Sequence, residues 1–134
     1  MPDTRSGPGR LLIAVYGLFA VAASARSGVQ IATRFAEAPV AYLLSAFAAV
    51  VYVVATVTLA VGSRASRRVA WVSCAVELVG VVVVGAVSFL VPSWFPQATV
   101  WSHFGSGYLF IPLVLPVLGL LWLRRTQPGI GMSA

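Results

Sequence analysis

The sequence predicts an all-α, polytopic membrane protein, with four transmembrane helices in an up-down bundle joined by short loops. The 134-residue chain is 60% hydrophobic and only 9% charged, whereas about a quarter of the residues of a soluble domain are charged. Its mean hydropathy is +0.96. The apolar residues form four separate segments, and none alternates with the period of two that is typical of a barrel strand. We therefore expect one membrane domain over residues 1–134.

The length of each segment justifies each helix in turn. A helix needs about 20 residues to cross a hydrocarbon core of roughly 30 Å. The second and third segments meet this requirement alone, and the first meets it if its apolar run continues past "ASA". The fourth is short and needs its approach through "FGSG" and its exit at Arg124. The predicted helices cover residues 11–32, 40–61, 69–91 and 107–123, with tails at 1–10 and 124–134.

The amino terminus permits a second interpretation. Arg5 and Arg10, an apolar stretch and "ASA" at residues 23–25 together resemble a secretory signal, with cleavage before Arg26. Three helices would then remain. Because the apolar run continues beyond this point as "GVQIA", we expect the first helix to be retained.

The distribution of arginine predicts the orientation. All nine basic residues are arginine, and with a cytoplasmic amino terminus seven lie inside and two outside, as the positive-inside rule requires. We therefore expect a multi-pass protein of a bacterial cytoplasmic (inner) membrane with both termini cytoplasmic. The net charge of +6 predicts no nucleic-acid partner, because the arginines flank apolar segments and do not interleave with aromatics on a polar face.

Glu77 is the acidic residue within the apolar run "WVSCAVELVGVVVVGAVSFL". It lies nine residues after Arg68, which is about 13 Å along a helix and close to the bilayer midplane. An ionised carboxylate there costs about 3 kcal/mol on insertion scales. We therefore expect the side chain to face other helices and either to find a partner or to remain protonated. Ser73 and Gly80 share its helix face, which is predicted to be the packing face.

Possible partners of Glu77 lie on other segments. Arg26 is the candidate cation, although it lies about 10 Å from Glu77 in depth, so direct pairing stays open. Tyr52 has a depth similar to that of Glu77 and either bonds to it or only packs nearby. The candidate intramembrane polar site comprises Glu77, Arg26, Gln30, Tyr52 and Ser73.

Small residues and prolines indicate how the helices pack. Small side chains that recur every four residues permit close approach of helix backbones. The predicted helix-packing residues are Ala41, Ser45, Ala49 and Gly80. Pro112 and Pro116 each remove a backbone donor from the fourth helix, which we therefore expect to be kinked or broken.

The outer loop, "PSWFPQATVWSHFGSG" at residues 92–107, is rich in aromatic residues and is predicted to lie at headgroup level. Its single histidine, His103, has no cluster of ligands around it in the sequence, so we expect no metal site. The single Cys74 has no second cysteine to pair with. The chain has no nucleophile motif, phosphate-binding glycine loop or dinucleotide fingerprint, and we expect neither a cofactor nor an enzymatic activity.

Two stretches, "RSGVQIATRFAEAPVAYLLSAFAAVVY" and "ATVWSHFGSGYLFIPLVLPVLGLLWLRR", resemble small, uncharacterised four-helix integral membrane proteins of actinobacteria, which have no known activity. The resemblance implies a source and a topology. The chain is also similar in length and helix number to the small multidrug-resistance exporters. Their essential membrane acid lies in the first helix, whereas Glu77 lies in the third.

Two functions are compatible with these features. The first is a non-enzymatic structural or accessory subunit of the cell envelope, which works in the lipid bilayer as a homodimer or within a larger membrane complex. The second is a small proton-coupled transporter or exporter in which Glu77 is the titrating acid. The first predicts that Glu77→Gln alters assembly more than flux, and the second predicts the reverse.

Overall fold

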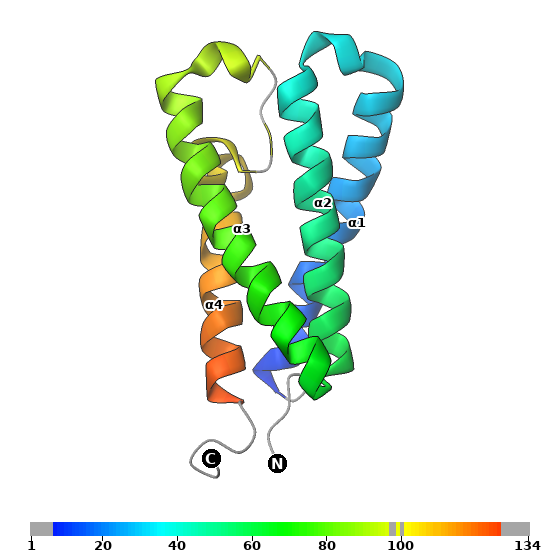
Figure 1. Cartoon of the computed structure of the whole chain (residues 1–134), viewed down its shortest axis with the longest axis vertical. Helices are drawn as coiled ribbons and strands as arrows, with labels where there is room; N and C mark the ends of the chain where they lie inside the picture. Colours follow the sequence, from blue (N-terminus) through cyan, green and yellow to red (C-terminus); the bar gives the residue numbers. More distant parts are fainter. Residues whose placement is uncertain (1–6, 97–98, 100, 127–134) are drawn as a thin grey trace.

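The computed structural model of the chain describes residues 7–96, 99 and 101–126. These residues are helical, with no strand among them. In Figure 1 the helices of residues 8–34, 39–61 and 64–90 run the length of the molecule, and the helix of residues 111–125 lies beside the lower half of the third. The helices are α1 (Pro8–Arg34), α2 (Pro39–Val61), α3 (Arg64–Leu90) and α4 (Ile111–Arg125), with short 3-10 helices η1 (Phe35–Glu37), η2 (Pro92–Trp94) and η3 (Ser102–Tyr108).

Three helices, α1 to α3, are long and apolar enough to cross a membrane. A fourth span results only if η3 and α4 are taken together, and these two are bent by 97° relative to each other. The prediction of an all-helical structure with helices apolar enough to span a membrane is therefore confirmed for the described residues. The fourth apolar segment is not one continuous helix.

Local sequence signals account for the ends of α2 and α3. Pro39 is the first residue of α2, where its missing N–H costs no helical hydrogen bond. Gly62 ends α2 with a left-handed φ of 71°, a conformation that glycine adopts without steric cost. Ser63 then caps α3 by accepting a hydrogen bond from the backbone N–H of Ser66 at 3.2 Å. Because of this cap, α3 begins at Arg64, five residues before the predicted 69.

The start of α4 differs from the sequence prediction. The helix begins at Ile111 and has 15 residues, or about 22 Å at 1.5 Å per residue, whereas residue 107 was the expected start. Leu109 and Phe110 have positive φ values of 59° and 60°, so the backbone cannot continue helically from η3. Pro112 lies in the first turn, where it is tolerated, and Pro116 is inside the helix. The predicted break thus lies just before Pro112.

The loop before α4 folds into the molecule and buries Trp101, so this aromatic residue packs against protein and not against headgroups. This side chain is 1% exposed, whereas Trp94 is 55% exposed. A tight turn directs Trp101 inward, because Thr99 and Ser102 bond each other's backbone and hydroxyl groups. The backbone of His103, Phe104 and Gly105 is also left-handed.

Two glycines of α3 make room for this loop. A Cβ at Gly80 would lie 2.5 Å from the Trp101 ring, and one at Gly85 would lie 2.3 Å from the Phe104 ring. Both rings therefore lie directly against the helix backbone. Gly80 was predicted to admit a neighbouring helix, and in the structure it admits an indole.

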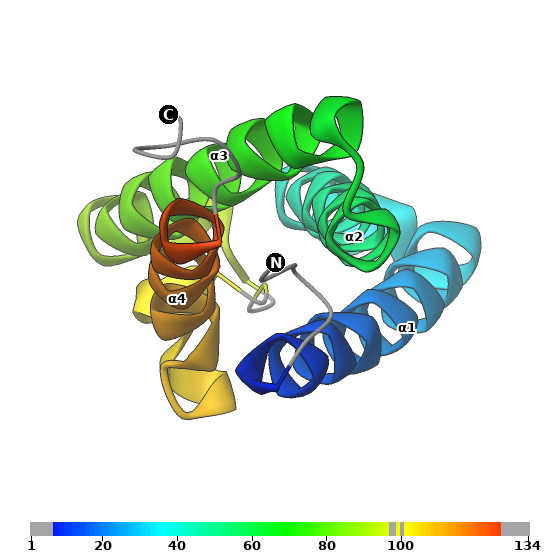
Figure 2. The same cartoon turned by 90° about the horizontal axis from the view of Figure 1, so that it is seen from below.

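Of the predicted packing residues of α2, Ser45 and Ala49 line cavities shared with α1, whereas Ala41 packs in a cluster with Tyr42 and Phe95. Ala41, Ser45 and Ala49 are all buried. Ser45 shares a small cavity with Phe19 and Ala23 of α1. Viewed from below, the four α-helices form a ring in which α1 and α2 lie side by side (Figure 2).

Candidate intramembrane polar site

Glu77 lies inside the bundle and bonds across helices. Its side chain is 0% exposed, and Oε1 accepts a hydrogen bond of 2.8 Å from the hydroxyl of Tyr16 on α1. The second carboxyl oxygen, Oε2, is buried and has no hydrogen-bond partner among the described atoms. The expectation that Glu77 faces other helices therefore agrees with its position, and its partner is a phenol.

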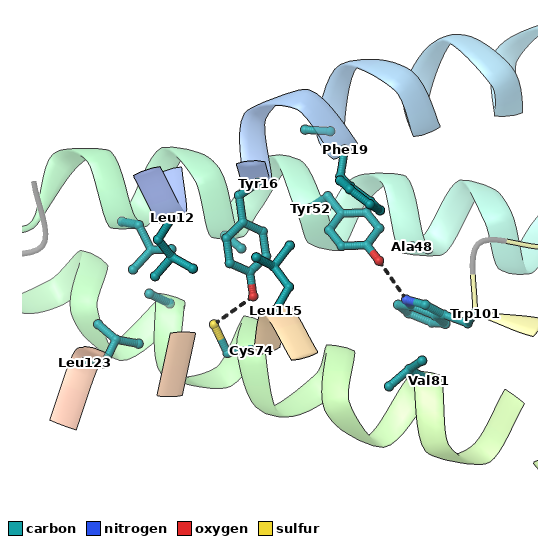
Figure 3. Packing of buried hydrophobic residues seen from close by; sticks show 14 of the residues in the cluster. Leu12, Tyr16, Phe19, Ala48, Tyr52, Cys74, Val81, Trp101, Leu115 and Leu123 are labelled. Atoms are coloured by element: carbon teal, nitrogen blue, oxygen red, sulfur yellow. Dashed lines mark hydrogen bonds between the residues drawn. The ribbon is translucent and has the colours of Figure 1, made fainter. Parts of the chain in front are cut away.

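Tyr16 lies against Glu77 and Cys74 of α3 and against α4 at Gly119. It is 0% exposed, and its hydroxyl also lies 3.4 Å from Sγ of Cys74 (Figure 3). On α4, a Cβ at Gly119 would lie 2.8 Å from that sulfur and 3.3 Å from the hydroxyl. Because residue 119 is glycine, the backbone of α4 can pack directly against the Tyr16 hydroxyl. The site brings together α1, α3 and α4.

Tyr52 belongs to an aromatic cluster next to this pair. Its hydroxyl accepts a hydrogen bond of 3.0 Å from the indole nitrogen of Trp101 (Figure 3). Its ring centroid lies 6.2 Å from that of Tyr16 and 5.6 Å from that of Phe19. Tyr52 is thus linked to Glu77 through its packing on Tyr16, and its hydroxyl bonds to the loop that carries Trp101.

The remaining predicted members of the site are Arg26, Gln30 and Ser73. They either lie away from Glu77 and Tyr16 or only pack near them. Arg26 is exposed in the carboxyl-terminal half of α1 and donates to the hydroxyl of Tyr108. Gln30 lies one turn further along α1 and is half-buried. Ser73 is buried on α3 one turn before Glu77. The structure therefore joins Glu77 to Tyr16, which the sequence reasoning did not select.

Arg67 is a second residue that the sequence reasoning missed. It is only 7% exposed and donates to the Leu123 carbonyl at 2.7 Å and to Oγ1 of Thr126 at 3.1 Å. A cation at the carbonyl end of a helix is favourable both as a hydrogen-bond donor and against the helix dipole. Arg67 lies ten residues before Glu77, which is about 80° away round the helix, so its spacing from Glu77 gave no clear sequence signal.

This arrangement has limited chemical capacity. A carboxyl group beside a phenol and a thiol can hold or exchange a proton and can fix the relative position of helices. Within the described ranges, no three His, Cys, Asp or Glu side chains come together as a metal site would require.

No protein-family model, curated protein or solved structure matches this chain.

Proposed function

We propose that this chain is a small, non-enzymatic integral membrane protein that serves as a structural or accessory subunit in a bacterial cell envelope. In this proposal it forms an up-down bundle of four spans in the inner membrane, with both termini cytoplasmic. It associates with a second copy or with a larger membrane complex, and it uses no cofactor and binds no nucleic acid.

The observation that carries the proposal is the enclosure of Glu77. A carboxyl group with 0% exposure offers no surface to a solute, whereas its hydrogen bond from Tyr16 ties α3 to α1. Polar side chains that bond across helices are a recognised source of helix association in lipid, where apolar contact gives little preference for protein over acyl chains. Glu77 therefore acts as a polar contact that sets how these helices meet.

The arginines support the proposed topology. Arg64 and Arg68 begin α3, and Arg124 and Arg125 end α4. The first turns of α1 and α3 and the last turn of α4 lie at one end of the molecule (Figure 1). A cluster of exposed arginines at one end is expected on the cytoplasmic side.

A specific observation favours a second candidate, the proton-coupled transporter. The Oε2 atom of Glu77 is buried without a partner, which is the state expected of an acid that gives up and regains a proton. Intramembrane acids often have that role.

Two variants of Glu77 separate these functions. Glu77→Gln keeps an acceptor for the Tyr16 hydroxyl but cannot titrate, whereas Glu77→Leu removes both the acceptor and the proton. The matched control is Glu37→Gln, because Glu37 is exposed. Assembly is measured by native mass spectrometry, and proton flux by a trapped pH-sensitive dye in proteoliposomes under a potassium diffusion potential.

For a structural subunit, we expect Glu77→Leu to shift the distribution of oligomers or complexes strongly and Glu77→Gln to shift it less. Both variants should leave proton flux at the level of empty vesicles, as the wild type does. Wild-type flux that disappears in Glu77→Gln while assembly is retained would replace this proposal with the transporter.

A further inference from the structure

An apolar groove runs between the first turns of α1 and the length of α4. Its volume is about 570 Å³, within the range of small-molecule sites. Seen from below, these two helices complete the ring of the bundle (Figure 2). The groove is lined by Pro8, Leu11, Leu12, Val15, Ile111, Val114, Leu115, Leu118, Leu121, Trp122 and Arg125.

The groove is apolar except at one end. Arg125 lies in the last turn of α4, and Pro8 is the first residue of α1. The positive end of the α1 dipole thus lies beside a guanidinium group, and the first turn of α1 contains no acidic residue. Both features favour a negative charge at this end.

The dimensions of the groove match one lipid leaflet. From Ile111 to Arg125 the helix rises about 21 Å, whereas half of a hydrocarbon core measures about 15 Å. With Arg125 placed at headgroup depth, a groove of this length reaches the middle of the membrane. An extended acyl chain with its phosphate at Arg125 has this length and polarity.

The composition of the walls favours an acyl chain over a second helix. Helix contacts in membranes use Gly, Ala and Ser to bring backbones close, and the groove lining contains none of these. Branched aliphatic side chains and the Trp122 ring leave an irregular channel that a flexible chain can follow.

We propose that this groove binds one anionic phospholipid from the leaflet at the Arg125 end. One acyl chain lies along Leu12, Leu115 and Leu118, and the phosphate bonds to Arg125. This site is separate from Glu77, and its occupancy does not depend on whether Glu77 has a packing or a transport role.

The first test uses native mass spectrometry of the full chain in mild detergent with phosphatidylglycerol or phosphatidylcholine added. Arg125→Gln removes the cation from the groove. Arg124→Gln is the matched control, because Arg124 precedes Arg125 at the same depth and does not line the groove. Circular dichroism establishes that each variant retains its helices.

We expect the wild type to retain one phosphatidylglycerol in preference to phosphatidylcholine. This retention should fall about tenfold in Arg125→Gln, the loss expected for a charge-assisted hydrogen bond, and less than twofold in Arg124→Gln. Equal retention of the two lipids by the wild type, or equal losses in the two variants, would overturn the proposal. A lipid-free dimer would likewise assign the groove to a second copy.

A second measurement does not depend on the Arg125 variant. Phosphatidylglycerol with brominated acyl chains should quench Trp122, and the effect is read as the difference in quenching between the wild type and Trp122→Phe. Brominated phosphatidylcholine at the same mole fraction should quench Trp122 less. Identical quenching by the two lipids would show that the contact is ordinary bilayer lipid.

Discussion

Replacing Tyr16 with phenylalanine tests whether the cross-helix hydrogen bond stabilises the bundle. The change removes one hydroxyl and leaves the ring, so the packing on Tyr52 at 6.2 Å is kept. What is lost is the donor to Oε1 of Glu77 at 2.8 Å. Because Oε2 already lacks a partner, the carboxyl group would have none in the described structure.

Two estimates bear on the magnitude. Cross-helix hydrogen bonds in membrane proteins contribute on average about 0.6 kcal/mol, with a maximum near 1.7, whereas a buried polar group left without a partner costs about 1–3 kcal/mol. The second applies here, because the side chain of Glu77 is 0% exposed. We therefore expect Tyr16→Phe to lower the free energy of unfolding by about 2 kcal/mol.

A double-mutant cycle isolates the pair. Glu77→Met removes the acceptor but leaves the Tyr16 hydroxyl near Sγ of Cys74 at 3.4 Å, so we expect a smaller loss of about 1 kcal/mol. The double variant should cost about 1 kcal/mol less than the sum of the two single variants. Unfolding in mixed micelles titrated with dodecyl sulfate and followed by circular dichroism gives each value. Additive losses, or a Tyr16→Phe variant as stable as the wild type, would refute the reasoning.

Two further predictions concern the inserted loop and the end of α4. Gly80→Ala places a Cβ 2.5 Å from the Trp101 ring, whereas no atom lies within 4 Å of a Cβ at Gly28. This overpacking should make Gly80→Ala about 2 kcal/mol less stable than Gly28→Ala. Equal midpoints in the same titration would mean that the indole does not lie on α3. Arg67→Met removes the cation from the last turn of α4 and should cost about 2 kcal/mol, whereas Arg68→Met, at an exposed position, should change stability by less than about 0.5 kcal/mol. If the Arg67→Met variant were as stable as Arg68→Met, the contact of Arg67 with the end of α4 would be contradicted.

The long helices could be predicted from the sequence because their signals are local. The start of α2 at Pro39 and its end before Gly62 follow from the apolar run and from residues that favour those helix ends. The burial of Glu77 could be predicted too, because the cost of exposing a carboxyl group to lipid does not depend on the details of the fold.

The partner of Glu77 could not be predicted in the same way. Tyr16 is separated from it by 61 residues, and one aromatic residue in an apolar segment resembles any other. Arg26 was the more conspicuous candidate because of its charge, but its position in the carboxyl-terminal half of α1 brings it to Tyr108. The sequence indicates how far along its helix each residue lies. Which side of the helix faces a given neighbour depends on tertiary packing, and the sequence does not indicate it.

The inserted loop was missed for a related reason. Aromatic residues near prolines are typical of an interfacial segment, and only the space beside Gly80 and Gly85 distinguishes a buried Trp101 from an interfacial one. Backbone away from regular helix is tolerated at membrane depth where protein encloses it. The loop is enclosed by α2 and α3, so the residues next to the loop in the sequence do not predict that it is buried.

The same loop makes the position of α4 depend on α2 and α3. Trp101 donates a hydrogen bond to Tyr52 on α2 and lies on Gly80 of α3, so its binding place is formed by those two helices together. The 15 residues of α4 are fewer than the roughly 20 needed to span a membrane alone. One tryptophan therefore couples the position of α4 to the packing of two other helices.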